Sequence, residues 1–161
     1  MSLSAGPRDT GFSLIELLVT LAILAVLASV AIPVAETAVQ RNRERELREA
    51  LRGIRQAIDA YKQAVDDGLI PRNIDQSGYP PNLKTLVNGV PNAKSPTRQL
   101  LYFLRRIPRD PFGAPDIPAE STWGVRSYAS PADAPAAGAD VYDIYSQSDR
   151  TGLNNIPYRQ W

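Results

Sequence analysis

The sequence predicts an α+β fold, in which one long N-terminal helix packs against a small antiparallel sheet. Three observations lead to this prediction. An uncharged run covers residues 17–35, a helical pattern of apolar residues continues to about residue 66, and nearly all of the prolines follow that point. Two later segments are rich in β-branched and aromatic residues, which is typical of strands. We therefore expect a membrane-spanning helix that continues into a soluble head.

The uncharged run comprises nineteen residues, from Leu17 to Ala35. At about 1.5 Å per residue, a helix of this length crosses a hydrocarbon core of about 30 Å. Glu16 lies at the start of the run, and a charged side chain inside a bilayer costs about 3 kcal/mol. We therefore expect Glu16 to have a partner.

Two simpler interpretations of the run remain open. A cleavable secretory signal is one, because residues 28–31 contain an A-x-A-like pattern. The other is a plain signal anchor in which Glu16 is incidental. Neither interpretation gives Glu16 a function.

Pro33 lies near the end of the uncharged run. Proline has no amide hydrogen, so the carbonyl of Ser29 loses its helical donor. We predict a helix kink at Pro33, the alternative being that Pro33 simply ends the span.

Beyond Glu36 the sequence becomes polar, but apolar residues recur at alternating steps of four and three. We call these residues the apolar seam: Leu47, Leu51, Ile54, Ile58, Tyr61 and Val65. This spacing places them on one face of a helix, which should run from Phe12 to about Asp66 and present the seam to the head. A dimeric coiled coil is the alternative use of the seam.

The head, residues 67–161, contains all but two of the fourteen prolines, which predicts short elements joined by ordered loops. Short helices are expected at 80–87 and at 97–106. In the second of these helices, Leu100, Leu101 and Leu104 should face the core.

Two strands are predicted near the end of the sequence. Residues 122–128 and 141–146 should pair as antiparallel strands joined by the Pro/Ala-rich loop 130–140.

The composition excludes several kinds of chemistry. There is no cysteine and no histidine, which removes disulfides, thiolate nucleophiles, imidazole bases and the usual zinc ligands. With 18 basic and 17 acidic residues the chain does not imply a nucleic-acid partner. An enzymatic or ligand-binding head would need carboxylates such as Asp143 and Asp149 in one cleft. We do not expect an enzyme.

The sequence Gly11-Phe12-Ser13-Leu14-Ile15-Glu16-Leu17-Leu18-Val19 resembles the processing motif of type IV pilins and type II secretion pseudopilins. The resemblance implies that prepilin peptidase cuts between Gly11 and Phe12 and that the new N-terminal Phe12 is methylated. Glu16 would then neutralise the α-ammonium of a neighbouring subunit in an assembly salt bridge. The implied segments are a leader at 1–11, a membrane and filament-core helix at 12–35, its amphipathic continuation at 36–66 and the head at 67–161.

Four sequence segments in the head make the resemblance more specific: they are similar to segments of the major pseudopilins of type II secretion systems. The matching segments occur in the family's order: Gly78 to Pro80, Leu83 to Val87, Ile107 to Gly113 and Val141 to Ser146. The resemblance implies a structural subunit of a pseudopilus, a helical filament that drives protein export. The alternative is a major or minor type IV pilin that serves adhesion, motility or DNA uptake.

The resemblance also implies a location and partners. We expect a single-pass inner-membrane protein with its head in the periplasm. Its partners would be identical subunits, minor pseudopilins, prepilin peptidase and the inner-membrane assembly platform. Five arginines follow the span, and the positive-inside rule alone would place the head in the cytoplasm. Because glutamates alternate with these arginines, we predict the periplasmic location.

Major pseudopilins commonly hold their C-terminal loop with calcium, which takes about six to eight oxygen ligands. The candidate Ca²⁺ ligands by this resemblance are Ser146, Ser148, Asp149 and Asn154, with Asn155 and main-chain carbonyls in support. Only one of these side chains is a carboxylate. The alternative is an ion-free loop, held by Asn and Ser hydrogen bonds and by Trp161.

Overall fold

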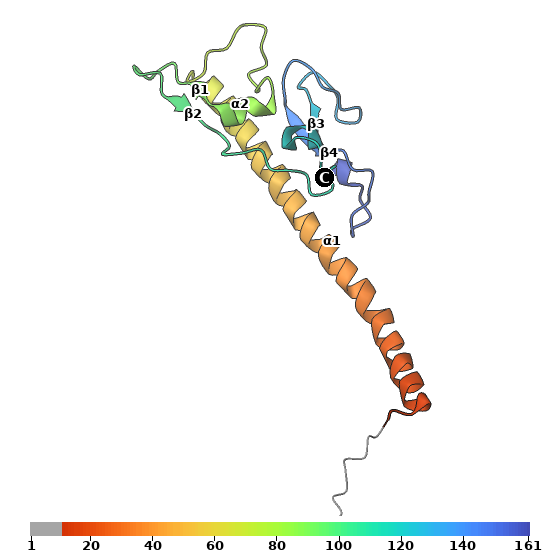
Figure 1. The fold of residues 1–161 in the computed structure, drawn as a ribbon. Helices are drawn as coiled ribbons and strands as arrows, with labels where there is room; N and C mark the ends of the chain where they lie inside the picture. Colours follow the sequence, from red (N-terminus) through yellow and green to blue (C-terminus); the bar gives the residue numbers. More distant parts are fainter. Residues whose placement is uncertain (1–10) are drawn as a thin grey trace, which may run out of the picture. The chain divides into compact units, whose positions relative to one another are not determined.

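A computed structural model describes residues 11–161, and Figure 1 shows its elements. In chain order these are α1 (Leu14–Asp66), α2 (Leu83–Asn88), β1 (Val90–Pro91), β2 (Leu100–Leu101), the 3-10 helix η1 (Ala119–Thr122), β3 (Trp123–Arg126), β4 (Asp143–Ser146) and the 3-10 helix η2 (Tyr158–Gln160). The predicted α+β class is confirmed. Apart from Gly11, the predicted leader lies outside the described residues.

The chain divides into two compact units at the boundary between Gln40 and Arg41. Helix α1 contributes its first part to the first unit and its second part to the second unit.

Helix α1 ends at a glycine that the backbone requires. Gly68 has a φ of +70°, which favours glycine because a side chain there would be strained. The amides of Gly68 and Leu69 donate to the carbonyls of Val65 and Ala64, at 2.9 and 2.8 Å. This pair of bonds is the Schellman motif that closes many helices. The predicted single long helix is confirmed, with its start at Leu14 and its end at Asp66.

The core of the second unit forms on one face of α1. All six residues of the apolar seam are buried, as predicted. The head supplies the opposing residues: Ile70, Leu83, Leu86, Trp123, Val141, Ile144 and Tyr158. The seam therefore packs against its own head, which leaves none of it for a coiled coil.

The predicted strands are confirmed and are shorter than expected. Strands β3 and β4 pair antiparallel, with Trp123 opposite Ser146 and Arg126 opposite Asp143. The loop between them is held at its base, because the amide of Ser127 donates to the carbonyl of Ala136 at 2.9 Å.

Helix α2 confirms the first predicted short helix, but it begins at Leu83, three residues later than expected. Asn82 caps it, since its side-chain oxygen accepts from the amide of Thr85 at 3.0 Å. The two prolines before Asn82 lie outside the helix, where their missing amides cost nothing.

The second predicted short helix, at 97–106, is wrong. Leu100–Leu101 forms β2, which pairs with β1, and the amides of Phe103 and Leu104 both donate to the carbonyl of Leu86. These amides therefore bond to distant segments instead of along a helix. Leu100 is 41% exposed, so its predicted core position is also wrong, whereas Leu101 and Leu104 pack against the core.

The packing of the seam gives a stability prediction. Replacing the fully buried Ile54 with alanine leaves a cavity, and we expect the free energy of unfolding to fall by about 3 kcal/mol. Denaturant unfolding of the purified protein, followed by circular dichroism, measures this change. Glu49→Ala, at an exposed position of the same helix, is the matched control and should change it by less than about 0.5 kcal/mol. An equal effect of the two variants would contradict the assigned core.

Candidate functional site at the start of α1

Gly11 and Phe12 precede α1 and are open to solvent. Phe12 is 82% exposed, and a Cβ added at Gly11 would meet no atom within 4 Å. The fold of this unit therefore does not require a glycine at position 11. The peptide bond between the two residues is accessible to an enzyme.

Glu16 lies in the first turn of α1 and caps it. Its Oε2 accepts a hydrogen bond from the amide of Ser13 at 3.1 Å. Because α1 begins at Leu14, Ser13 is the N-cap and Glu16 is the third helical residue, as in a capping box. The Ser-x-x-Glu spacing is the sequence signal for this capping role, which the sequence-based expectations do not include.

The capping bond fixes the direction of the Glu16 carboxylate. The carboxylate points toward the N-terminal end of α1. A negative charge at this end also interacts favourably with the helix dipole. Within residues 11–161, its second oxygen, Oε1, has no hydrogen-bond partner. An additional donor near Phe12 could therefore be bound without breaking an existing contact.

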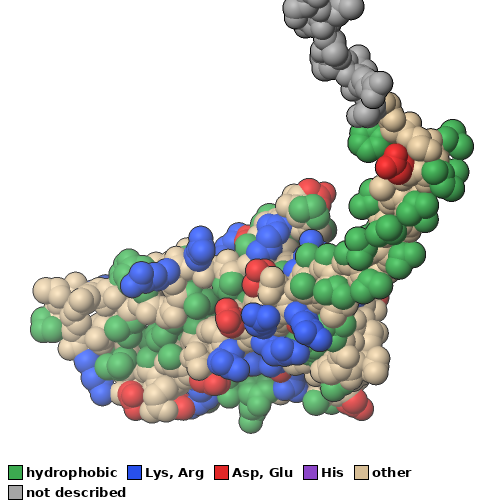
Figure 2. Space-filling view, turned by 90° about the horizontal axis from the view of Figure 1, so that it is seen from below, with side chains coloured by type: hydrophobic (Ala, Val, Ile, Leu, Met, Phe, Trp, Pro, Cys, Tyr) green, Lys and Arg blue, Asp and Glu red, His purple; other side chains and the backbone are tan. Residues whose placement is uncertain are grey.

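Apolar side chains, green in Figure 2, cover most of the visible face of the part of α1 in the first unit. From Phe12 to Val39 every large apolar side chain is at least 50% exposed. Within the described residues, α1 is the one helix that is long and apolar enough to cross a membrane. Apolar exposure on this scale requires a cover of lipid or of other apolar helices.

Helix α1 runs through Pro33 without interruption. The hydroxyl of Thr37 donates to the carbonyl of Pro33 at 2.8 Å, and that of Ser29 donates to the carbonyl of Val26 at 2.7 Å. Such side-chain bonds to the preceding turn are compatible with a local bend. The kink at Pro33 stays a prediction.

The four candidate Ca²⁺ ligands all have other partners. The hydroxyl of Ser146 donates to Oδ2 of buried Asp110 at 2.6 Å, and the hydroxyl of Ser148 accepts from the amide of Arg150. The carboxylate of Asp149 pairs with Arg159 at 2.8 Å, and Oδ1 of Asn154 accepts from the amide of Ile156.

This donor set does not fit a calcium ion. Calcium sites are built from several oxygens, usually with carboxylates among them, and the one carboxylate here already faces an arginine. Among residues 11–161 there is no group of three or more His, Cys, Asp or Glu residues that could hold a metal.

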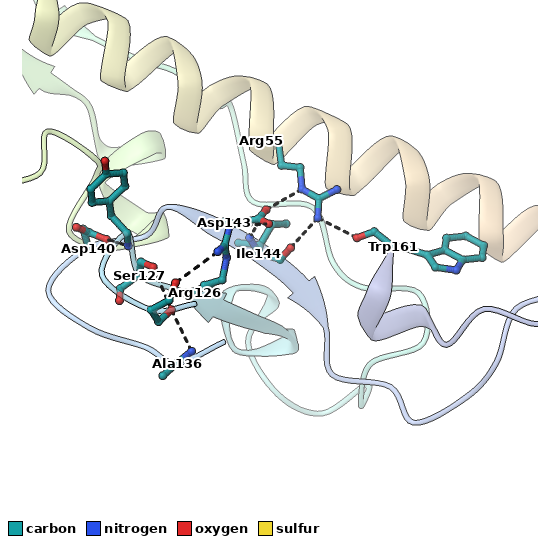
Figure 3. Close-up of polar contacts among 10 residues, drawn as sticks. Arg55, Arg126, Ser127, Ala136, Asp140, Asp143, Ile144 and Trp161 are labelled. Carbon is teal, nitrogen blue, oxygen red and sulfur yellow. Dashed lines mark hydrogen bonds and ion pairs between the residues drawn. The ribbon is translucent and has the colours of Figure 1, made fainter. Parts of the chain in front are cut away.

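Arg55 of α1 connects the helix to β4 and to Trp161, as Figure 3 shows. Its guanidinium donates to Oδ1 of Asp143 at 2.8 Å and to the main-chain oxygens of Ile144 and Trp161, at 3.1 and 2.9 Å. Asp143 and Asp149 thus pair with different arginines. The carboxylate pair that an enzymatic head would need is not assembled by these two residues.

Three ionisable groups of the second unit have shifted pKa values. Burial raises the pKa of Tyr61. Burial, and then the neighbouring Tyr142 and Asp59, raise the pKa of Tyr79. The pKa of Glu120 is lowered, first by a hydrogen bond from the backbone of Glu120 itself and second by a hydrogen bond from the Lys84 side chain. None of the three belongs to the predicted site.

A long apolar helix, a glutamate in its first turn and a small antiparallel sheet together define a type IV pilin-like subunit. Residues 7–32 match the family model described as the prokaryotic N-terminal methylation motif. This match covers the predicted cleavage site and most of the apolar run.

Two curated relatives give a closer assignment. Type II secretion system core protein G of Klebsiella pneumoniae is 30% identical over 112 residues, 66% of this chain and 71% of that protein. Core protein G of Dickeya chrysanthemi is 28% identical over 111 residues, 66% of this chain and 65% of that protein. No solved structure matches the chain. The chain belongs to the type II secretion system core protein G family, the major pseudopilins, and is a pseudopilin subunit.

Proposed function

We propose that the chain is made as a precursor that prepilin peptidase cuts between Gly11 and Phe12, with N-methylation of Phe12 after the cut. The accessible and sterically unconstrained peptide at this position supports the proposal. The match of residues 7–32 to the methylation motif also supports it. The domain boundaries that follow are 1–11, 12–35, 36–66 and 67–161.

The processed subunit assembles into a pseudopilus and has a structural role, not a catalytic one. The exposed apolar surface of α1 from Leu14 to Val34 supports assembly, because copies of this helix can cover one another as lipid does. Identical subunits that contact one another through two different surfaces form a helical filament when the contacts do not close into a ring. Minor pseudopilins and the inner-membrane assembly platform are the further partners in this proposal.

The position of the Glu16 carboxylate is the single observation on which the assembly mechanism depends. Cleavage creates an α-ammonium on Phe12, the residue next to the capped Ser13. In an apolar filament core an unpaired charge is costly, so each Glu16 carboxylate should bind the ammonium of a neighbouring subunit. Every subunit supplies one carboxylate and one ammonium, so the charges balance along the filament.

The head lies in the periplasm on an inner-membrane anchor in this proposal. Arg48, one of the five arginines that follow the span, and Arg55, further along α1, both contact residues of the head. The guanidinium of Arg48 lies 4.3 Å from the centre of the Trp161 ring, and its Nη2 lies 3.5 Å from the Glu44 carboxylate. Arg55 binds Asp143. These residues therefore stabilise the head.

Gly11→Leu tests the cleavage. We expect the variant to insert into the membrane and remain uncut, because the side chain would disturb the peptidase and not the fold. Intact-mass measurement of the membrane-extracted protein should then show residues 1–11 retained and no added methyl group. Gly53→Ala is the matched control, since Gly53 is also free of close neighbours, and it should be cut normally. A correctly cut Gly11→Leu protein would contradict the assigned site.

Replacement of Glu16 tests the ion pair separately from the helix cap. Glu16→Gln keeps an oxygen that can accept from Ser13, as glutamine does in capping boxes, but lacks the charge. We expect Glu16→Gln and Glu16→Ala both to insert, to be cut and to fail to form filaments, because an unpaired buried charge costs about 3 kcal/mol or more. Electron microscopy of sheared filaments measures this outcome.

The control for this experiment is Glu36→Gln, at the other end of the uncharged run. This variant should assemble like the unmodified protein. Normal filaments from Glu16→Gln would show that capping suffices and would refute the ion pair. Failure of Glu36→Gln would show that assembly responds to any loss of charge.

A further inference from the structure

We propose that the buried carboxylate of Glu44, and not a bound cation, holds the C-terminal segment 147–161 against α1. This proposal concerns the second unit alone and does not depend on filament assembly.

Glu44 is a buried acidic residue on α1, with a residue exposure of 3%. Its Oε1 accepts from the amide of Leu153 at 2.7 Å and from the hydroxyl of Tyr158 at 3.0 Å. Its Oε2 faces Nη2 of Arg48 at 3.5 Å. A carboxylate can be buried at acceptable cost when its oxygens accept hydrogen bonds of this kind, and bonds to a charged acceptor are among the strong ones.

The neighbouring arginines of α1 hold the far end of the same segment. Arg55 donates to the main-chain oxygen of Trp161 at 2.9 Å. The guanidinium of Arg48 stacks on the indole ring of Trp161, in a cation–π contact. The segment is therefore attached to α1 at its middle, through Leu153 and Tyr158, and at Trp161.

The inner side of the segment is closely packed. The Tyr158 ring is fully buried and stacks on Phe112 with 4.1 Å between ring centres. A Cβ on Gly152 would come within 2.5 Å of the Trp161 ring and 2.7 Å of Oδ1 of Asn154. The segment thus has a fixed conformation that leaves no room for a side chain at Gly152.

The residues expected to bind Ca²⁺ make hydrogen bonds or ion pairs within or next to the C-terminal segment. Asn154 accepts from the amide of Ile156 within the segment, and Ser146 donates to Asp110 beneath it. The Asp149 side chain is 90% exposed and paired with Arg159. Glu44, the carboxylate that does bind the segment, uses direct hydrogen bonds at distances that leave no space for an ion between the groups.

Hydrogen–deuterium exchange of the full chain in detergent tests the proposal. Exchange of the 147–161 peptide is measured in EGTA and in about 10 mM CaCl₂, which is above the range of weak extracellular calcium sites. The peptide 71–76, from a separate exposed loop, serves as the internal reference. We expect exchange of 147–161 in the unmodified protein to be the same in both conditions.

Glu44→Ala should speed exchange of 147–161 by about tenfold or more, since two hydrogen bonds to a buried charge are lost. The matched control is Glu46→Ala, two residues along the same helix at an exposed position, and it should exchange like the unmodified protein. Slower exchange in calcium than in EGTA would overturn the proposal. Equal exchange of the Glu44 and Glu46 variants would also overturn it.

Tyr158→Phe keeps the test decisive if Glu44→Ala does not fold. This change removes the hydroxyl that donates to Glu44 and retains the ring that stacks on Phe112. We expect exchange of 147–161 to rise by about tenfold to a hundredfold, which corresponds to the loss of one hydrogen bond to a charged group. Exchange equal to that of the unmodified protein would overturn the proposal.

Discussion

The structure depends on one constraint, which is that the apolar residues of a single unbroken helix need two different kinds of cover. In the first part of α1 the apolar side chains lie on all sides and remain exposed, so their cover must come from lipid or from other copies. In the second part they form one seam, which the head buries completely. The spacing of apolar residues along α1 therefore determines which part is left for assembly and which part stabilises the subunit.

Polar residues on the second part of α1 do more than keep the helix soluble. Glu44 and Arg55 lie eleven residues apart, about three helical turns, and both bind segments from the end of the chain. A charged residue that binds several partners of a folded head is a structural element of that head.

The sequence predicts the parts of this fold that depend on local pattern. The extent of α1 follows from the seam and from Asp67-Gly68, and β3 and β4 follow from their β-branched and aromatic residues. The error at 97–106 has a long-range cause, because the amides of Phe103 and Leu104 bind the carbonyl of Leu86. For the candidate site, Glu16 was identifiable from its motif. Leu153 and Tyr158, which bind Glu44 from the C-terminal segment, are 109 and 114 residues away from it, a separation over which no local sequence pattern operates.

Glu16 and Glu44 are both carboxylates among apolar residues, but they find hydrogen-bond donors to different extents. A carboxylate among apolar residues must find donors, and both residues obey the rule. Glu44 finds its donors within the folded head, on Leu153 and Tyr158, so its charge serves the stability of the subunit. Glu16 finds only the amide of Ser13 within the described residues and keeps one oxygen without a donor. The incomplete pairing of Glu16, in a segment whose apolar side chains are also exposed, supports the proposal that this residue makes contacts between subunits.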